Sequence, residues 1–199
     1  MHTFIARLWP VFVVAFVAVY ASGTSLMLAK TAVMQEDPNL DAIVTGGGTV
    51  NVAPGVASFG LNAKRPAGYL PGQAQGRINY DKHFAVAGGR HVNAPVTKMQ
   101  ATTTNTPPNH TGGDATLVGD CTQPNAECAN PAGTTIYVLV YVVDSADNGA
   151  NDTFEISFCT IGTPELPDPN TFPGAVPTGC TPLEGGNLRS GNVQIRPRP

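Results

Sequence analysis

Apolar and polar residues alternate in short runs along most of this chain, and clusters of turn residues separate the runs. From Ala42 onward no segment has the 3.6-residue period of an amphipathic helix, whereas alternation with a period of two recurs. The pattern predicts an all-β protein. The predicted strands are Ile43–Val44 with Thr49–Val52, Val56–Lys64, Gly76–His83, His91–Thr103, Ala115–Val118, Thr134–Val143, Thr153–Thr160 and Asn192–Arg196.

Two of these strands carry the strongest signal. Residues 134–143 are apolar on both faces, so we expect this strand in the centre of a sheet, with cover on both sides. Residues 153–160 alternate, with Phe154, Ile156 and Phe158 on the inner face. The dipeptide Asn148-Gly149 lies between the two strands and is typical of tight hairpin turns, so we expect them to pair.

About eight short strands at this spacing favour an antiparallel β-sandwich, which we predict as a single domain over residues 42–199. Two stretches, 105–114 and 162–178, carry seven prolines between them, and proline lacks the amide donor that a sheet requires. We therefore predict that they are surface loops inserted into the sandwich. The expected core is Phe59, Leu61, Ile78, Tyr80, Val138, Val140, Phe154, Ile156, Phe158, Val193 and Ile195.

The N-terminal residues have the pattern of an export signal. Arg7 precedes an uncharged, mostly apolar run, and small residues of the kind that signal peptidase accepts follow it. We interpret residues 1–29 as a signal helix that is cleaved off, and residues 30–41 as a polar leader to the domain. The alternative is a retained membrane anchor, because Leu8–Ala29 carries no charge and is long enough to span a bilayer.

Four cysteines, Cys121, Cys128, Cys159 and Cys180, agree with export. An even number of cysteines in an exported chain predicts disulfides, and four cysteines allow three pairings. We favour Cys121–Cys128 and Cys159–Cys180, which are local and close loops rich in Pro, Asn and Gly. A zinc site is the alternative, although the usual short C-x-x-C spacing is absent and no histidine follows Cys121. The expected location is secreted or at the cell surface.

Charge is sparse and uneven in this chain, which has a net charge of −3 and 13% charged residues. This composition argues against disorder and coiled coils, and the negative net charge argues against a nucleic-acid partner. Between Lys64 and Lys98 the only acid is Asp81, whereas residues 114–184 hold ten acids and neither Lys nor Arg. Either the two stretches form separate regions, which would favour head-to-tail association or an anionic polymer as partner, or they interleave in space and keep the domain soluble.

One cluster of oxygen ligands lies between the two strongest strands. Asp144, Asp147, Asn148 and Asp152 fall within nine residues, and closely spaced carboxylates and amides suit Ca²⁺. Their spacing is not that of an EF-hand. The alternative is a polar turn in which these side chains bind nearby backbone amides. Apart from this possible calcium ion, we expect no cofactor.

Several sequence blocks, taken in order, resemble a known family. The blocks are Thr45–Gly48, Ala57–Arg65, Gly76–His83, the hairpin that joins Tyr141–Asp144 to Asp152–Ile156, and Gly185–Ile195. Together they cover nearly all of residues 42–196 and resemble the post-COAP domains, small β-rich modules of exported, mostly bacterial proteins. The proline-rich insertions and the cysteines depart from the family's pattern. The resemblance implies an exported module and supplies no catalytic activity that can be carried over to this chain.

Catalytic motifs are weak in this sequence. There is no G-x-S-x-G elbow, the cysteines are expected to be oxidised, and nothing pairs two carboxylates as a glycosidase requires. We therefore predict a non-catalytic module with a structural or adhesive role, whose partner is an extracellular polysaccharide or a surface protein, and which meets the membrane only through an uncleaved N-terminal segment. One alternative is a glycan- or calcium-binding module, and another is an extracellular hydrolase.

Overall fold

The computed structural model describes residues 42–65, 70, 72–83, 89–103, 112–129, 133–145, 149 and 151–197. The chain divides into two units, Met1–Asp37 and Pro38–Pro199, and all of the described residues belong to the second. The predicted signal helix, the polar leader through residue 41 and residues 105–111 of the first predicted loop lie outside the described residues. Within the described ranges, no helix has the length and apolar character needed to cross a bilayer.

The described part of the chain is built from strands that are all antiparallel to their neighbours. Their bounds are β1 (Ala42–Asn51), β2 (Val56–Lys64), β3 (Gln73–His83), β4 (Arg90–Thr103), β5 (Gly113–Asp120), β6 (Glu127–Ala129), β7 (Tyr137–Asp144), β8 (Thr153–Cys159) and β9 (Glu184–Pro197). The predicted hairpin is confirmed, since β7 pairs with β8 from Tyr137 opposite Cys159 to Val143 opposite Thr153.

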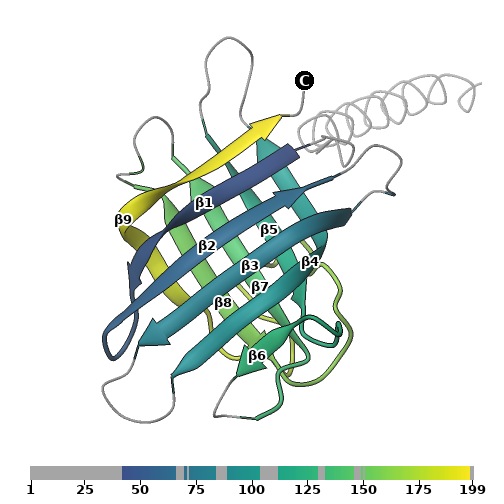
Figure 1. Ribbon diagram of the computed structural model, residues 1–199. Coiled ribbons are helices and arrows are strands. Elements are labelled where there is room, and N and C mark those ends of the chain that lie inside the picture. The colour runs from purple at the N-terminus through teal and green to yellow at the C-terminus, as the bar shows by residue number, and fades with distance from the viewer. Residues whose placement is uncertain are drawn as a thin grey trace, which may run out of the picture. The chain divides into compact units, whose positions relative to one another are not determined.

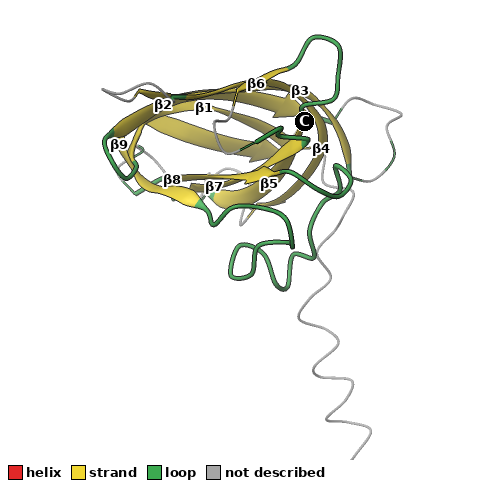
Figure 2. Ribbon diagram, turned by 90° about the horizontal axis from the view of Figure 1, so that it is seen from below, coloured by secondary structure: helices red, strands yellow, loops and turns green. Residues whose placement is uncertain are grey.

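The strands close into a barrel, so the predicted β-sandwich is wrong. The sheet order is β3-β2-β1-β9-β8-β7-β5-β4-β6, and β3 also pairs with β4, which leaves every strand except the short β6 with a neighbour on each side. Figure 1 shows β1, β2 and β3 in front of β7 and β8, and Figure 2 shows the closed, flattened ring from below. Alternation of inner and outer residues is the same in a sandwich and a barrel, so the sequence pattern did not distinguish them.

Two long strands, β4 and β9, make the closure possible because each changes partners along its length. β4 pairs with β6 through His91–Asn93 and then with β5 through Val96–Thr103. β9 pairs with β8 through Glu184–Asn187 and then with β1 through Leu188–Pro197. Gly191 has a φ of 106°, and a Cβ at this position would lie 2.1 Å from the carbonyl oxygen of Gly47. Glycine therefore allows β9 to approach β1 closely at the bend. Gly46–Gly48 separates the predicted strands Ile43–Val44 and Thr49–Val52 but lies inside the continuous strand β1, and a Cβ on Gly48 would lie 2.1 Å from the carbonyl oxygen of Ser190.

The inner faces of the barrel strands meet in a filled core. Every residue of the predicted core is buried, which confirms that list. Aromatic rings form its centre: Phe59 stacks on Phe154 with ring centroids 4.1 Å apart, and Tyr80 lies 6.0 Å from Phe154 and from Phe158. Aromatic pairs at such separations add to the stability that comes from burial alone.

The second proline-rich stretch covers part of the outside of the barrel. Residues 160–183, here called the strap, run between β8 and β9 without a regular strand, as predicted for 162–178. Phe172 of the strap packs with Val118, Tyr137 and Leu139 in a second apolar cluster. The predicted cover on both faces of residues 134–143 is therefore confirmed, with the barrel core on one side and the strap on the other (Figure 2).

Both predicted disulfides are present. Cys121–Cys128 closes the turn between β5 and β6, and Cys159–Cys180 ties the strap to the end of β8. No cysteine is free among the described residues. Disulfides of this kind are compatible with an extracellular protein.

Candidate functional site: a groove on the open face of the barrel

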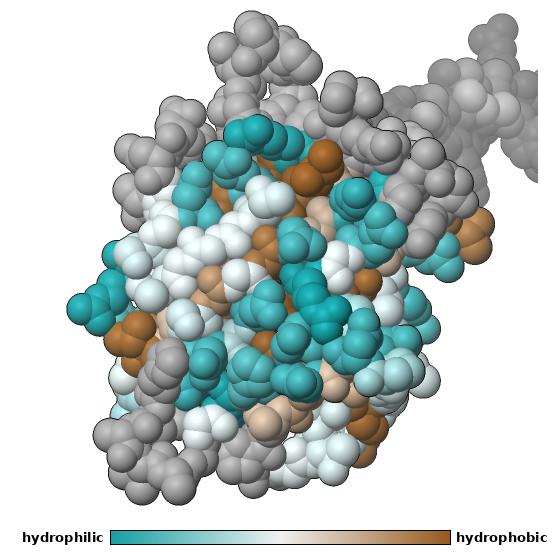
Figure 3. Space-filling model, viewed as in Figure 1, coloured by the Kyte–Doolittle hydropathy of each residue, from teal (hydrophilic) through white to brown (hydrophobic). Residues whose placement is uncertain are grey.

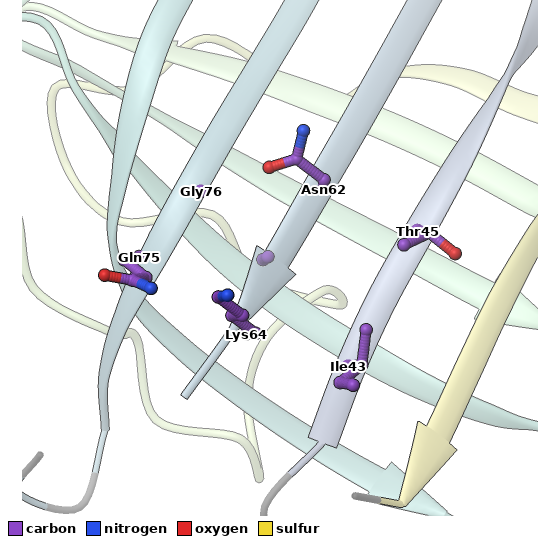
Figure 4. Close-up of a pocket in the computed structure, with 7 residues that line it drawn as sticks. Ile43, Thr45, Asn62, Lys64, Gln75 and Gly76 are labelled. Carbon is purple, nitrogen blue, oxygen red and sulfur yellow. The ribbon is translucent and has the colours of Figure 1, made fainter. Parts of the chain in front are cut away.

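A groove crosses the outer surface of β1, β2 and β3, on the part of the barrel that the strap leaves open. Its volume is about 510 Å³, and it is lined by Ile43, Thr45, Asn62, Ala63, Lys64, Gln75 and Gly76. Figure 4 shows the side chains of three neighbouring strands around this hollow. The groove is an open, shallow surface, because Thr45, Asn62, Lys64 and Gln75 are all exposed.

Strand register places these side chains beside one another. Ile43 lies opposite Lys64 and Thr45 lies opposite Asn62 across the β1–β2 pair, while Lys64 lies opposite Gln75 across the β2–β3 pair. Directly opposed residues of an antiparallel pair point to the same face, so Thr45 lies beside Asn62, and Lys64 lies between Ile43 and Gln75.

A close approach of the backbones shapes one wall of the groove. Gly76 has a φ of 153°, and a Cβ there would lie 2.0 Å from the carbonyl oxygen of Asn62. The register between β3 and β4 shifts between Gln73 and Gly76. Glycine is therefore required where β3 passes this close to β2, next to the register shift, and Gly76 forms part of the groove wall.

Three cations lie on the same outer face as the groove. Lys64 and Arg196 are both exposed and lie opposite Ile43 on its two sides, from β2 and β9. Arg77 lies opposite Asn62 on β3. Its guanidinium donates to the side-chain oxygen of Asn93 and to the backbone carbonyl of Asn125, which are neutral acceptors. Figure 3 views this face, which is mainly white and teal with isolated brown atoms.

A second polar cluster is buried at the end of the barrel where β3 ends and β4 and β9 begin. Glu184 accepts hydrogen bonds from the Tyr80 hydroxyl and from Lys82 Nζ, both at 2.7 Å. Arg90 lies 2.9 Å from the same carboxylate, and its guanidinium lies 4.7 Å from the centroid of the Phe158 ring. Lys82 is only 4% exposed and Glu184 is 16% exposed, so this carboxylate neutralises two largely buried cations.

The protonation of this cluster follows from its contacts. Burial alone would raise the pKa of Glu184, but hydrogen bonds from Lys82 and Tyr80 and the charges of Arg90 and Lys82 outweigh it and lower the pKa. Burial and the bond to Glu184 raise the pKa of the Tyr80 hydroxyl. The cluster is therefore a closed ion network in its charged state, with every member paired inside the barrel.

Sequence analysis did not predict this cluster, although one signal pointed to it. The alternation that places Ile78 and Tyr80 on the inner face of β3 places Lys82 there as well. Lys82 and Arg90 belong to the basic stretch of the sequence, and Glu184 belongs to the acidic one. Contacts between the stretches, which also include Lys98 with Glu165 and His91 with Glu127 at 3.6 Å, show that the stretches interleave at these positions.

The predicted calcium site lies only partly within the described residues. Asp144 is 5% exposed and Asp152 is fully buried, whereas Asp147 and Asn148 lie outside the described part of the chain. Asp152 accepts from the amides of Ser145 at 3.0 Å and Val193 at 2.7 Å, and Asp144 accepts from the amide of Ile195 at 2.9 Å. These two carboxylates thus join the β7–β8 hairpin to β9, and calcium binding at the tip stays a prediction.

Metal-ligand chemistry has no other candidate in the described residues. Among them, no group of three or more His, Cys, Asp or Glu side chains is placed to hold a metal ion.

Comparisons of the chain with family models, with curated proteins and with solved structures find no match. The resemblance to the post-COAP domains therefore stays a prediction.

Proposed function

We propose that this protein is an exported, non-catalytic adhesive module that binds a polysaccharide chain in the groove on the outer face of β1, β2 and β3. The observation that carries the proposal is the set of polar side chains on that open surface: Thr45, Asn62, Lys64 and Gln75. Hydroxyl, amide and ammonium groups can donate and accept hydrogen bonds with the many hydroxyl groups of a sugar polymer.

The form of the groove supports a polymer over a small molecule. It is shallow and open along the face, whereas sites for small molecules are concave and enclose most of the ligand. A polymer can lie across the face and continue beyond it at both ends. The residues that line the groove include no carboxylate, histidine or serine, so the pair of carboxylates needed for glycoside hydrolysis has no counterpart among them.

Electrophoresis of the full chain through native gels that contain a dissolved polysaccharide tests this proposal. We expect at least one polysaccharide to retard the wild-type protein. The double variant Thr45→Val/Gln75→Ala removes two neutral hydrogen-bonding groups and is expected to weaken binding roughly tenfold, because each such bond contributes about 0.5–1.5 kcal/mol.

Thr116→Val is the matched control, since it makes the same hydroxyl-to-methyl exchange on β5, away from the groove. This variant should be retarded like the wild type. Failure of acidic and neutral polysaccharides alike to retard the wild-type protein would overturn the proposed function.

A further inference from the structure

We propose that the ligand of the groove is an acidic polysaccharide, whose carboxylate or sulfate groups are recognised by Lys64 and Arg196. This inference rests on the proposed function and names the chemical class of its ligand.

Strand register separates the two cations by one strand. Lys64 of β2 and Arg196 of β9 both lie opposite Ile43 of β1. Neighbouring strands are about 4.8 Å apart, so the two backbone positions are separated by roughly 10 Å across the face. Two anionic groups on one extended chain could therefore meet one cation each.

These cations keep their charge available to a ligand. Arg196 donates to the neutral amide oxygen of Gln194 at 2.7 Å, and within the described residues no carboxylate forms an ion pair with Lys64 or Arg196. Arg77 adds a third positive charge held by neutral acceptors. Elsewhere the pattern differs, because Lys82, Arg90 and Lys98 each contact a glutamate.

The electrostatic balance of this face is positive although the whole chain has a net charge of −3. On the paired, outward-facing positions of β1, β2, β3 and β9 that the structure describes, Lys64, Arg77 and Arg196 stand against a single acid, Asp81. This face would therefore attract an anionic polymer, although the protein as a whole carries a negative net charge.

The neutral residues around Lys64 point to a sugar polymer among anionic ligands. Thr45, Asn62 and Gln75 supply hydroxyl and amide groups that match sugar hydroxyls, and no aromatic ring lines the groove to stack on nucleobases. Because neutral hydrogen bonds exchange with water at little net gain, charge-assisted bonds to Lys64 and Arg196 should provide most of the affinity.

The test measures the affinity of the full chain for four probes at two salt concentrations. The probes are polygalacturonate, dextran sulfate, neutral dextran and poly-L-glutamate. We expect both acidic polysaccharides to bind more tightly than dextran and poly-L-glutamate, and the affinity to fall as salt rises, because ion pairing releases counterions.

Variants of the two cations make the test specific. Lys64→Gln/Arg196→Gln should reduce the affinity for acidic polysaccharide about tenfold and flatten its salt dependence, as expected for the loss of two exposed ion pairs. Lys64→Arg/Arg196→Lys keeps both charges and should restore binding. Lys98→Gln removes a cation that already contacts Glu165 and should leave affinity unchanged.

Each outcome separates the two proposals. Equal binding of dextran and the acidic polysaccharides, insensitive to Lys64→Gln/Arg196→Gln, would overturn this inference and leave the proposed function standing. Equal or tighter binding of poly-L-glutamate would identify an acidic protein as the ligand and overturn both. Absence of binding to any polysaccharide would overturn the proposed function and this inference with it.

Discussion

At the scale of single residues, the charged cluster shows how buried charge is held inside the barrel. Glu184 is the shared partner of Tyr80, Lys82 and Arg90, and Lys82 is almost fully buried. Removing one member of a buried ion pair costs more than the pair itself contributes, because the remaining charge stays desolvated. The carboxylate of Glu184 is therefore the member whose loss affects most contacts at once.

We predict that Glu184→Gln destabilises the protein by about 2–4 kcal/mol, since it leaves two largely buried cations without their carboxylate. Urea denaturation of variant and wild type measures the difference. Glu127→Gln is the matched control: Glu127 is 73% exposed beside His91, so its loss should change stability by less than about 0.5 kcal/mol. An equal effect of both substitutions would contradict the role assigned to Glu184.

The same cluster predicts that the free energy of unfolding of the wild-type protein falls at acidic pH. The pKa of Glu184 in the folded protein lies below its ordinary value of 4.5. Its contribution is therefore fully present above that value and is lost as the pH falls through the lower, folded-state pKa. Urea unfolding between pH 7 and pH 3 should show a steeper decline for the wild type than for Glu184→Gln. Parallel declines of the two proteins would show that protonation of Glu184 does not cause the loss of stability.

Residue patterns predicted the core of the barrel better than its polar contacts. Tyr80, Phe154 and Phe158 follow from alternation with a period of two, which depends only on neighbouring residues. The partner of Lys82 does not, because Glu184 lies 102 positions away along the chain and reaches it only once the barrel has closed. The groove residues Thr45, Asn62 and Gln75 gave no sequence signal, since exposed polar residues on a strand are ordinary.

At the scale of strands, glycines decide where one backbone can approach another. Gly191 combines a φ of 106° with a neighbouring carbonyl at the position its Cβ would take, whereas a Cβ at Gly60 would meet nothing within 4 Å. Replacing either glycine by alanine adds the same methyl group, but of the two only the Cβ at residue 191 would clash with a neighbouring backbone.

We predict that Gly191→Ala destabilises the barrel by about 3 kcal/mol, through backbone strain and the clash with Gly47. Gly60→Ala, the matched control, should be neutral or up to about 1 kcal/mol more stable, because alanine has less conformational freedom to lose. Thermal and urea unfolding measure both variants. Tolerance of alanine at residue 191 would contradict the closure of β9 on β1 at this point.

The sequence did not predict that the strands close into a barrel, because closure depends on pairing between strands far apart in the chain. The runs 134–143 and 153–160 were identified and their pairing was correct, because hairpin pairing is local and its turn signal is strong. The pairing of β9 with β1 joins the two ends of the described chain. Gly46–Gly48 and Gly191, which permit that contact, are typical of turns in an isolated sequence and of bends in a closed barrel.

The strap provides a further test at this scale. Replacing Cys159 and Cys180 together by alanine should lower stability by about 3 kcal/mol, because a cross-link over a separation of 21 residues restricts the unfolded chain. Loosening the strap should also expose Tyr137 and Leu139 and increase binding of a hydrophobic dye. Cys121→Ala/Cys128→Ala, with a separation of 7, should cost about 2 kcal/mol without added dye binding. Equal dye binding by the two variants would contradict the strap's covering role.

At the scale of the whole molecule, the outside of the barrel has two contrasting parts. The strap packs on the apolar outer side chains of β5 and β7. The outer face of β1, β2 and β3 is open and largely polar (Figure 3), and it carries the cations Lys64 and Arg77. Both faces belong to strands that already have neighbours on each side, so the open face is available to a ligand without disturbing the barrel. This arrangement supports a binding module in which the barrel is the scaffold.

An NMR titration of the ¹⁵N-labelled full chain with polygalacturonate fragments tests the binding face most directly. If the groove is the site, the amide shifts that change most will be those of residues 43–45, 62–64, 75–77 and 194–196, and they will be reduced in Lys64→Gln/Arg196→Gln. Shift changes confined to the strap and β7, or unaffected by loss of the two cations, would contradict binding at the open face.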